Sequence, residues 1–226
     1  MTPAPRYRGT HGPPAQRAAI NPCGLPIDDW TLAGVILLAM ASRSAAGSIR
    51  GVQPGDVGRL QAIQLAAGDA FRNVGMGSVA ESPPLPAESL SGYRKAGRAW
   101  VAVDDHDEPV GFVVADVIDG NAHIEQVSVH PAHARQGIGA MLLDHVAAWA
   151  ARRGLPALTL ITFRGVPWNA PYYERLGFRE LAPAELTPRL AALWAAAPGA
   201  GRDSPERVCM RRDVRPGTRA GADANS

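Results

Sequence analysis

The stretch that decides the fold is HPAHARQGIGAMLL, residues 130–143. Its two glycines, Gly137 and Gly139, stand between an apolar strand-like run and a segment whose apolar residues recur at helical spacing. A strand that passes through a glycine loop into a helix presents free backbone N–H groups at the helix start, where the helix dipole also favours negative charge. The stretch therefore predicts a loop that binds an anion such as a phosphate group.

Three other interpretations fit this loop less well. A P-loop needs Gly-Lys-Ser/Thr, but Lys95 is the only lysine of the chain. A dinucleotide-binding fold wants a third glycine where Leu142 stands. A zinc site would use His130 and His133 with His123 as a third ligand, but no nearby cysteine or carboxylate completes the set. We therefore expect no metal and interpret these histidines as solvent-exposed loop residues.

Length and composition predict a single domain with extensions. The chain has 226 residues, of which 46% are hydrophobic and 19% charged, as is typical of globular proteins. The net charge of +2 predicts no strong affinity for nucleic acid. Two distant cysteines, Cys23 and Cys209, suggest no disulfide framework and fit a cytoplasmic location. The apolar run at residues 31–40 is too short to span a bilayer, so no membrane segment is expected.

The hydrophobic pattern divides the chain into three parts. Residues 1–47 show no period and predict a poorly ordered N-terminal extension. Residues 48–212 predict the folded domain, and residues 213–226 predict a disordered tail. The three strands between residues 99 and 129 are expected to form an antiparallel meander. In all we expect strands at 48–52, 99–103, 110–118, 122–129, 157–163, from 178 and at 207–212, helices at 57–65, 87–96, 137–153, 169–176 and 190–197, and a loop at 75–86.

Three motifs in order resemble the GNAT superfamily of acetyl-CoA-dependent N-acetyltransferases. They are VHP at residues 129–131, RQGIGA at 135–140 and NAPYYERLGF at 169–178. The resemblance covers residues 48–212 and is strongest at 124–178. It implies an α/β fold with a central mixed, mostly antiparallel sheet of six to seven strands flanked by helices. The sequence departs from the family pattern at Ala134, where Arg or Gln is usual for contact with pyrophosphate.

The resemblance also implies a site for acetyl-CoA as cosubstrate. In this family the strand that ends in Val-x-Pro separates from its neighbour and pantetheine lies in the gap, so Val127 and Val129 are expected to offer backbone contacts. Asn169 is expected to reach the cofactor from the start of a short helix, although an asparagine there is also an ordinary N-cap. The residues expected to hold the pyrophosphate are Arg135, Gln136, Gly137, Ile138, Gly139 and Ala140.

Acetyl transfer to an amine needs a base for the amine proton and an acid for the departing thiolate. Tyr173 occupies the place of the family's thiol-protonating tyrosine; packing in the core is the alternative. Glu125 is the candidate base, because strand alternation puts it on the face of Val127 and Val129. A structural ion pair is the alternative for Glu125, and His123 is the reserve candidate.

The sequence thus predicts a cytoplasmic acyltransferase that moves acetyl from acetyl-CoA directly to a primary amine of a small molecule or peptide. The alternative is a non-catalytic acyl-CoA-binding or regulatory module of the same fold, for which Ala134 is the one hint. Neither nucleic acid nor membrane is expected as a partner. The acceptor is expected to be selected by the loops at residues 73–92 and 163–168 and by the C-terminal segment. The identity of the acceptor, and whether the protein is a homodimer, stay open.

Overall fold

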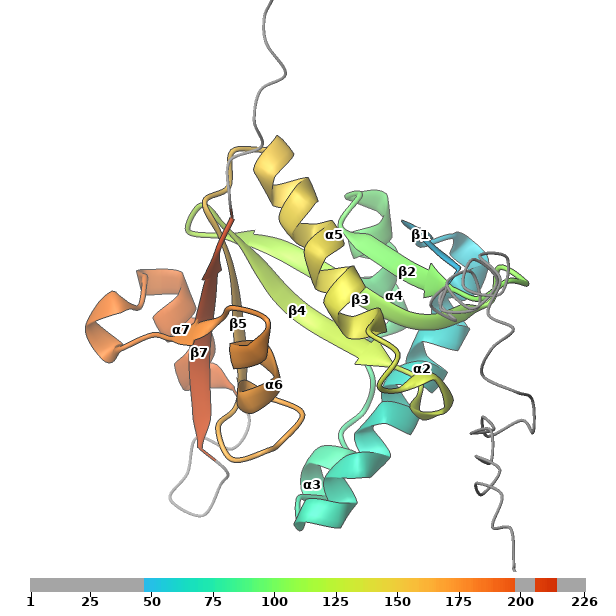
Figure 1. The fold of residues 1–226 in the computed structure, drawn as a ribbon, viewed down its shortest axis with the longest axis horizontal. Coiled ribbons are helices and arrows are strands. Elements are labelled where there is room, and N and C mark those ends of the chain that lie inside the picture. Colours follow the sequence, from blue (N-terminus) through green and yellow to red (C-terminus); the bar gives the residue numbers. More distant parts are fainter. Residues whose placement is uncertain (1–46, 198–205, 215–226) are drawn as a thin grey trace, which may run out of the picture. The chain divides into compact units, whose positions relative to one another are not determined.

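A seven-stranded sheet in the order β1-β2-β3-β4-β5-β7-β6 forms the centre of the computed structural model, which describes residues 47–197 and 206–214 (Figure 1). All neighbouring strands pair antiparallel except β4 and β5, which run parallel. The mixed, mostly antiparallel sheet expected from the sequence is confirmed. The expected extension and tail lie almost entirely outside the described residues. The strands are β1 (Ser48–Gly51), β2 (Ala99–Val103), β3 (Pro109–Ile118), β4 (Asn121–Val129), β5 (Ala157–Phe163), β6 (Arg179–Glu180) and β7 (Arg207–Asp213).

Helices cover both faces of the sheet. One face, called the α5 face, carries α5 (Ile138–Arg152) and the short α6 (Ala170–Arg175), which share one apolar cluster with the sheet. The opposite face, called the α7 face, carries α2 (Val57–Gly68) and α4 (Ala87–Lys95) against β2 and β3. On the same face α7 (Pro188–Ala196) packs against β5 and β7. No helix among the described residues is long and apolar enough to cross a bilayer.

Helix α5 confirms the helical periodicity expected after residue 137. A fully buried Leu, Ile or Val side chain contributes about 1.5–3 kcal/mol of burial free energy. The apolar side of α5 therefore holds the helix firmly on the sheet. The helix ends at Arg152, and Gly154 with a φ of 68° allows the chain to turn away. Its buried residues are Ile138, Leu142, Leu143, Val146, Trp149 and Ala150.

Strands β4 and β5 pair over a short length only. Residues 122–124 of β4 pair with residues 158–160 of β5, and the pairing then stops. Beyond that point residues 125–129 remain paired with β3, while residues 161–163 remain paired with β7. The two strands therefore diverge, and α6 and the start of α5 lie near the open end (Figure 1). We call this divergence the fork.

A β-bulge lies in β4 at the point where the fork begins. The register of β3 against β4 shifts between Val114 and Ala115, which pair with Gln126 and Ile124. Glu125 is therefore the extra residue of the bulge. Such a residue leaves the ladder and redirects the side chains on either side of it.

The bulge interrupts the alternation of side chains along β4, from which the face of Glu125 was predicted. Ile124 and Val127, three positions apart, both pack in the cluster on the α5 face. Glu125 instead lines a cavity that α7 borders. The prediction that Glu125 shares a face with Val127 and Val129 is therefore wrong, because one extra residue inverts the alternation.

Two further differences concern the segment after α2. The expected loop at residues 75–86 contains the short helix α3 (Gly77–Ala80), preceded by a 3₁₀ segment, Asp69–Val74. Side chains of this segment, among them Phe71, join Phe163 in a small apolar cluster. Contacts with a distant part of the chain thus order residues whose composition indicates a loop. Leu65, counted among the apolar positions of α2, is 47% exposed.

Candidate active site

The glycine loop leaves the start of α5 open to an anion. Gly137 is the N-cap of α5, with a left-handed φ of 81°, and no side chain caps the first turn. The N–H groups of Ile138, Gly139 and Ala140 are the first of the helix and have no acceptor within it. Together with the helix dipole they give the start of α5 the features that an anion site requires.

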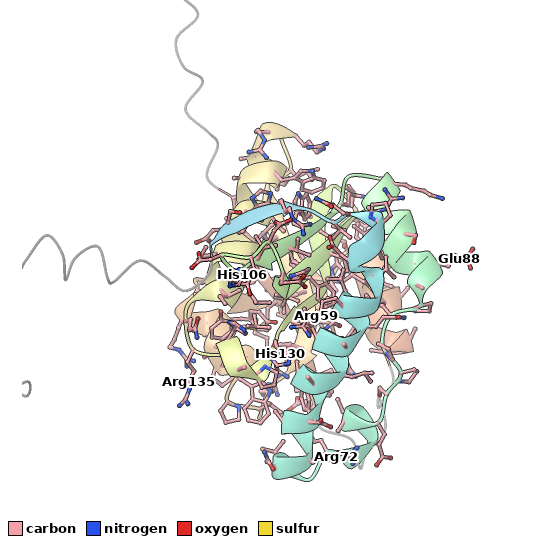
Figure 2. The ribbon with its side chains drawn as sticks, turned by 90° about the vertical axis from the view of Figure 1, so that its right-hand side faces the viewer. Arg59, Arg72, Glu88, His106, His130 and Arg135 are labelled. Carbon is pink, nitrogen blue, oxygen red and sulfur yellow. The ribbon has the colours of Figure 1, made fainter. Side chains whose placement is uncertain are left out.

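Arg135 is held in a strained conformation within this loop. Its φ of 62° is left-handed, which costs a residue with a Cβ about 1–2 kcal/mol. The side chain is exposed and points away from the protein (Figure 2). Ala134 before it is extended, with a ψ of 156°. Backbone strain of this kind clusters at ligand sites, where an outward guanidinium has access to a phosphate.

The two histidines of the loop have different surroundings from His123. His130 Nδ1 accepts a hydrogen bond from the Ala132 N–H at 3.3 Å, and its ring centroid lies 6.1 Å from that of His133. His123 is buried within β4, where its Nδ1 lies 3.0 Å from Thr159 Oγ1. Across residues 47–197 and 206–214 no group of three His, Cys, Asp or Glu residues is placed to hold a metal ion.

Tyr172 joins the glycine loop to α6. A Cβ added at Gly139 would lie 2.7 Å from the Tyr172 hydroxyl oxygen, closer than real Cβ contacts come. Glycine at this position therefore permits α6 to pack against the first turn of α5.

Tyr173 is buried, with 9% of its surface exposed. Its ring packs edge-on against Tyr172 at 5.5 Å and against Phe178 at 5.6 Å, measured between centroids. Within the described part of the chain its hydroxyl has no hydrogen-bond partner. Burial raises the pKa of the phenol above its ordinary value, so Tyr173 keeps its proton at neutral pH.

Asn169 begins α6 through its backbone only. Its carbonyl oxygen accepts hydrogen bonds from the N–H groups of Tyr172 and Tyr173 at 2.8 and 3.0 Å. The side chain makes no capping hydrogen bond. The ordinary side-chain N-cap therefore does not account for this asparagine, and its amide is left for other contacts.

Glu125 and His123 are the titratable groups of β4 at the fork. Loss of solvation and, to a lesser degree, repulsion by Asp116 raise the pKa of the Glu125 carboxyl above its usual range. Burial lowers the pKa of His123 to about 4, so its imidazole is neutral at pH 7. A carboxylate with a raised pKa is a better proton acceptor than an ordinary glutamate, whereas the neutral imidazole is held by Thr159.

A cavity of about 280 Å³ lies at the fork on the α7 face. We call it the fork cavity. Its α7 wall and Arg207 were not identified from the sequence, because no local motif marks them and they meet β4 only through the fold. Its lining residues are His123, Ile124, Glu125, Ile161, Leu193, Ala196, Ala197 and Arg207.

The expected site residues thus fall on the two sides of the fork. The glycine loop, Tyr173 and the Asn169 helix belong to the α5 face, where Val127 and Val129 also pack. Glu125 belongs to the α7 face. An anion loop and a carboxylate therefore lie at one pair of separated strands, which allows a phosphate-bearing molecule and a basic molecule to meet between them.

Comparison with known proteins agrees with this geometry. Residues 79–178 match the model of the Acetyltransferase (GNAT) family. Peptidyl-lysine N-acetyltransferase YjaB of Salmonella typhimurium is 30% identical over 99 residues, which are 44% of this chain. The chain spans 62% of the length of that relative.

Solved structures share the fold. The ribosomal-protein-S18-alanine N-acetyltransferase of Escherichia coli has a TM-score of 0.52 at 18% identity, over 79% of this chain and 99% of that chain. Rv2747 of Mycobacterium tuberculosis, whose structure is a complex with CoA and NLQ, has a TM-score of 0.56 at 16% identity, over 75% of this chain and 100% of that chain.

Proposed function

We propose that this chain, whose residues 79–178 match the model of the acetyltransferase (GNAT) family, is an acetyltransferase that transfers an acetyl group from acetyl-CoA directly to a primary amine. The observation that carries the proposal is the fork, which has an anion loop on one side and a carboxylate of raised pKa on the other. The cytoplasmic location expected from the cysteine usage is part of the same proposal.

Cofactor binding falls to the α5 face. The first N–H groups of α5 bind the pyrophosphate, and Arg135 and Gln136 supply the side chains that Ala134 lacks. The backbone of Val127 and Val129, which has no partner strand on the β5 side, pairs with the amides of pantetheine. The free side-chain amide of Asn169 adds a contact at the start of α6.

Two side chains move the protons of the reaction. An alkylamine has a pKa near 10 and must lose a proton before it attacks, and Glu125 accepts that proton. The nitrogen forms a bond to the acetyl carbon, and the bond from that carbon to sulfur breaks. Tyr173 donates its phenolic proton to the thiolate that leaves.

Two features support a transferase over a binding module. A module that binds acyl-CoA without turnover needs the loop but no base or acid, whereas this chain has both beside the fork. YjaB acts on peptidyl-lysine and the Escherichia coli enzyme on an alanine of a ribosomal protein. We therefore propose a primary amine of a small molecule or peptide as the acceptor.

The test is an assay of free CoA thiol with acetyl-CoA and a panel of amines. We expect turnover with at least one amine, and Glu125→Gln should lower kcat/KM about 100-fold or more. The pKa of Glu125 is raised, so the rate should fall as the pH drops through a value above the ordinary range of glutamate, and this acid limb should be absent in the variant. Tight CoA binding without turnover of any amine would instead favour the binding module.

A further inference from the structure

Helix α7 lies outside the part of the chain that matches the family. The match ends at residue 178, whereas α7 lies between β6 and β7 and spans Pro188–Ala196. It nevertheless borders the fork cavity through Leu193 and Ala196. One wall of the candidate acceptor site is therefore formed by residues outside the matched region.

The helix is fixed to the domain at both ends. At its start, Asp119 in the β3–β4 turn accepts a hydrogen bond from the Arg189 N–H at 2.9 Å. The hydrogen bond from the Thr187 side chain and, to a lesser degree, that from the Arg189 N–H lower the pKa of the Asp119 carboxyl. At its end, the indole N–H of Trp194 donates to the carbonyl oxygen of Arg207 at 3.1 Å.

Between these ends α7 packs on the sheet. Leu190 is buried in a cluster with Leu181 and Cys209, and Ile161 of β5 packs against the cluster. The wall that α7 offers is therefore in place before any ligand binds. Preorganised side chains of this kind discriminate between ligands at little cost in ordering.

The lining of the fork cavity divides into an apolar approach and a polar end. Ile161 of β5 and Leu193 and Ala196 of α7 present apolar surface, and the Arg207 side chain also lines the cavity. Glu125 presents the carboxylate at the fork, beside the neutral and buried His123. A ligand nitrogen at Glu125 must carry its substituent along these apolar side chains.

We propose that α7 selects acceptors whose primary amine stands on an unbranched aliphatic stem. The proposal rests on the proposed function and assigns its acceptor site to the fork cavity. Methylene groups lose contact with water against Ile161, Leu193 and Ala196, which favours binding. An aminosugar would place hydroxyl groups against the same side chains without hydrogen-bond partners, which disfavours it. A lysine side chain and a free alkylamine share the required chemistry.

A matched pair of alanines in α7 tests the proposal in the full chain. Both alanines are exposed, but Ala196 lines the cavity and its neighbour Ala195 does not. The variants are Ala196→Leu, which fills part of the cavity, and Ala195→Leu, which adds the same side chain outside it. The acceptors are n-butylamine, a short peptide with one internal lysine and blocked ends, and glucosamine, each at saturating acetyl-CoA.

The expected result separates the two variants. Ala196→Leu should raise KM for butylamine and for the lysine peptide about tenfold, because one or two methylene groups in a pocket change specificity by this order. Ala195→Leu should change KM by less than about twofold. Glucosamine should be the poorest acceptor of the wild type. Equal effects of the two variants, or a preference for glucosamine, would overturn the proposal.

A binding measurement distinguishes failure of the proposal from failure of the proposed function. The shift in Tm caused by butylamine is measured on each protein with bound CoA, where no transfer is required. If no amine is acetylated, the proposed function fails. The acceptor site is still supported if butylamine shifts the Tm of the wild type and of Ala195→Leu but not the Tm of Ala196→Leu. The same Tm shift in both variants, or none in the wild type, overturns it. Turnover of the peptide alone identifies a peptidyl lysine as the acceptor, and turnover of butylamine alone identifies a free alkylamine. Either result supports the proposal.

Discussion

The two sides of the fork are built in different ways. On the α5 face, the glycine loop, Asn169 and the two tyrosines all come from residues 130–178. On the α7 face, Asp119, Glu125, Leu193 and Arg207 come from segments far apart in the sequence. The side that we assign to the cofactor therefore depends on local motifs, whereas the side that we assign to the acceptor depends on tertiary contacts. This difference explains why short motifs identify a cofactor class and not an acceptor.

The two faces also differ in what they bury. The α5 face closes over one large apolar cluster. The α7 face buries polar groups of β4 and β5, with His123 against Thr159, and an ion pair of Arg98 with Asp116 lies half-buried nearby. Burial lowers the pKa of a histidine on each face, namely His145 of α5, which packs on Trp100, and His123, which is the more deeply buried of the two.

The largest expected effect is a loss of stability in acid that originates at His123. The folded protein keeps this imidazole neutral down to about pH 4, whereas the unfolded chain protonates it near pH 6.5. The unfolded state therefore binds more protons between these values, and the free energy of unfolding falls as the pH falls through them. At 1.36 kcal/mol per pKa unit, the fall is about 3 kcal/mol.

Urea denaturation at pH 7 and pH 4.5 measures this loss. His123→Gln should remove most of the difference between the two pH values, because glutamine does not titrate. His106→Gln is the matched control, since His106 is exposed, and should leave the difference unchanged. A similar pH dependence in His123→Gln and the wild type would contradict the assignment.

The next effect concerns Tyr173 on the α5 face. Tyr173→Phe should lower kcat about 100-fold, because the thiolate loses its proton donor. The free energy of unfolding should change little, since the hydroxyl makes no hydrogen bond within the described residues. Steady-state kinetics and urea denaturation measure the two quantities. An unchanged kcat would leave Tyr173 as a core residue only, and Tyr172→Phe, the neighbouring control, should lower kcat far less.

The smallest of the three effects lies where α6 meets the glycine loop. Gly139→Ala should weaken acetyl-CoA binding about tenfold, because the new Cβ lies 2.7 Å from the Tyr172 hydroxyl oxygen and displaces it or the helix start. Calorimetry measures the affinity. Without that oxygen the nearest Tyr172 atom is Cζ at 3.6 Å, an ordinary contact. The double variant with Tyr172→Phe should therefore regain most of the affinity, and no recovery would show that the glycine is required for another reason.

Much of the fold follows from the sequence because its signals are local. The apolar period of α5, the Asp119-Gly120 turn and the apolar runs of β2 and β3 are each signals from a short stretch of chain. The order of strand, glycine loop and helix also follows from the sequence, and Gly137 has the left-handed φ that this loop needs.

The remainder depends on contacts that no single segment contains. The bulge at Glu125 is a property of the β3–β4 pair, so alternation within β4 alone gives the wrong face. Residues 77–80 are helical where the composition indicates a loop, and the segment packs on Phe163 from a distant strand. Leu193 and Ala196 enter the candidate site only because α7 folds back over β5 and β7.

The attachment of α7 at both ends is separate from the residues that we assign to the cofactor. Its two fastenings, to Asp119 and to Arg207, involve none of the residues assigned to the cofactor. Changes in Leu193 or Ala196 therefore act on the fork cavity while leaving the glycine loop and α6 as they are, and distant changes of this kind combine additively. Under the proposed assignment, substitutions in α7 change the choice of acceptor while the cofactor side of the fork stays the same.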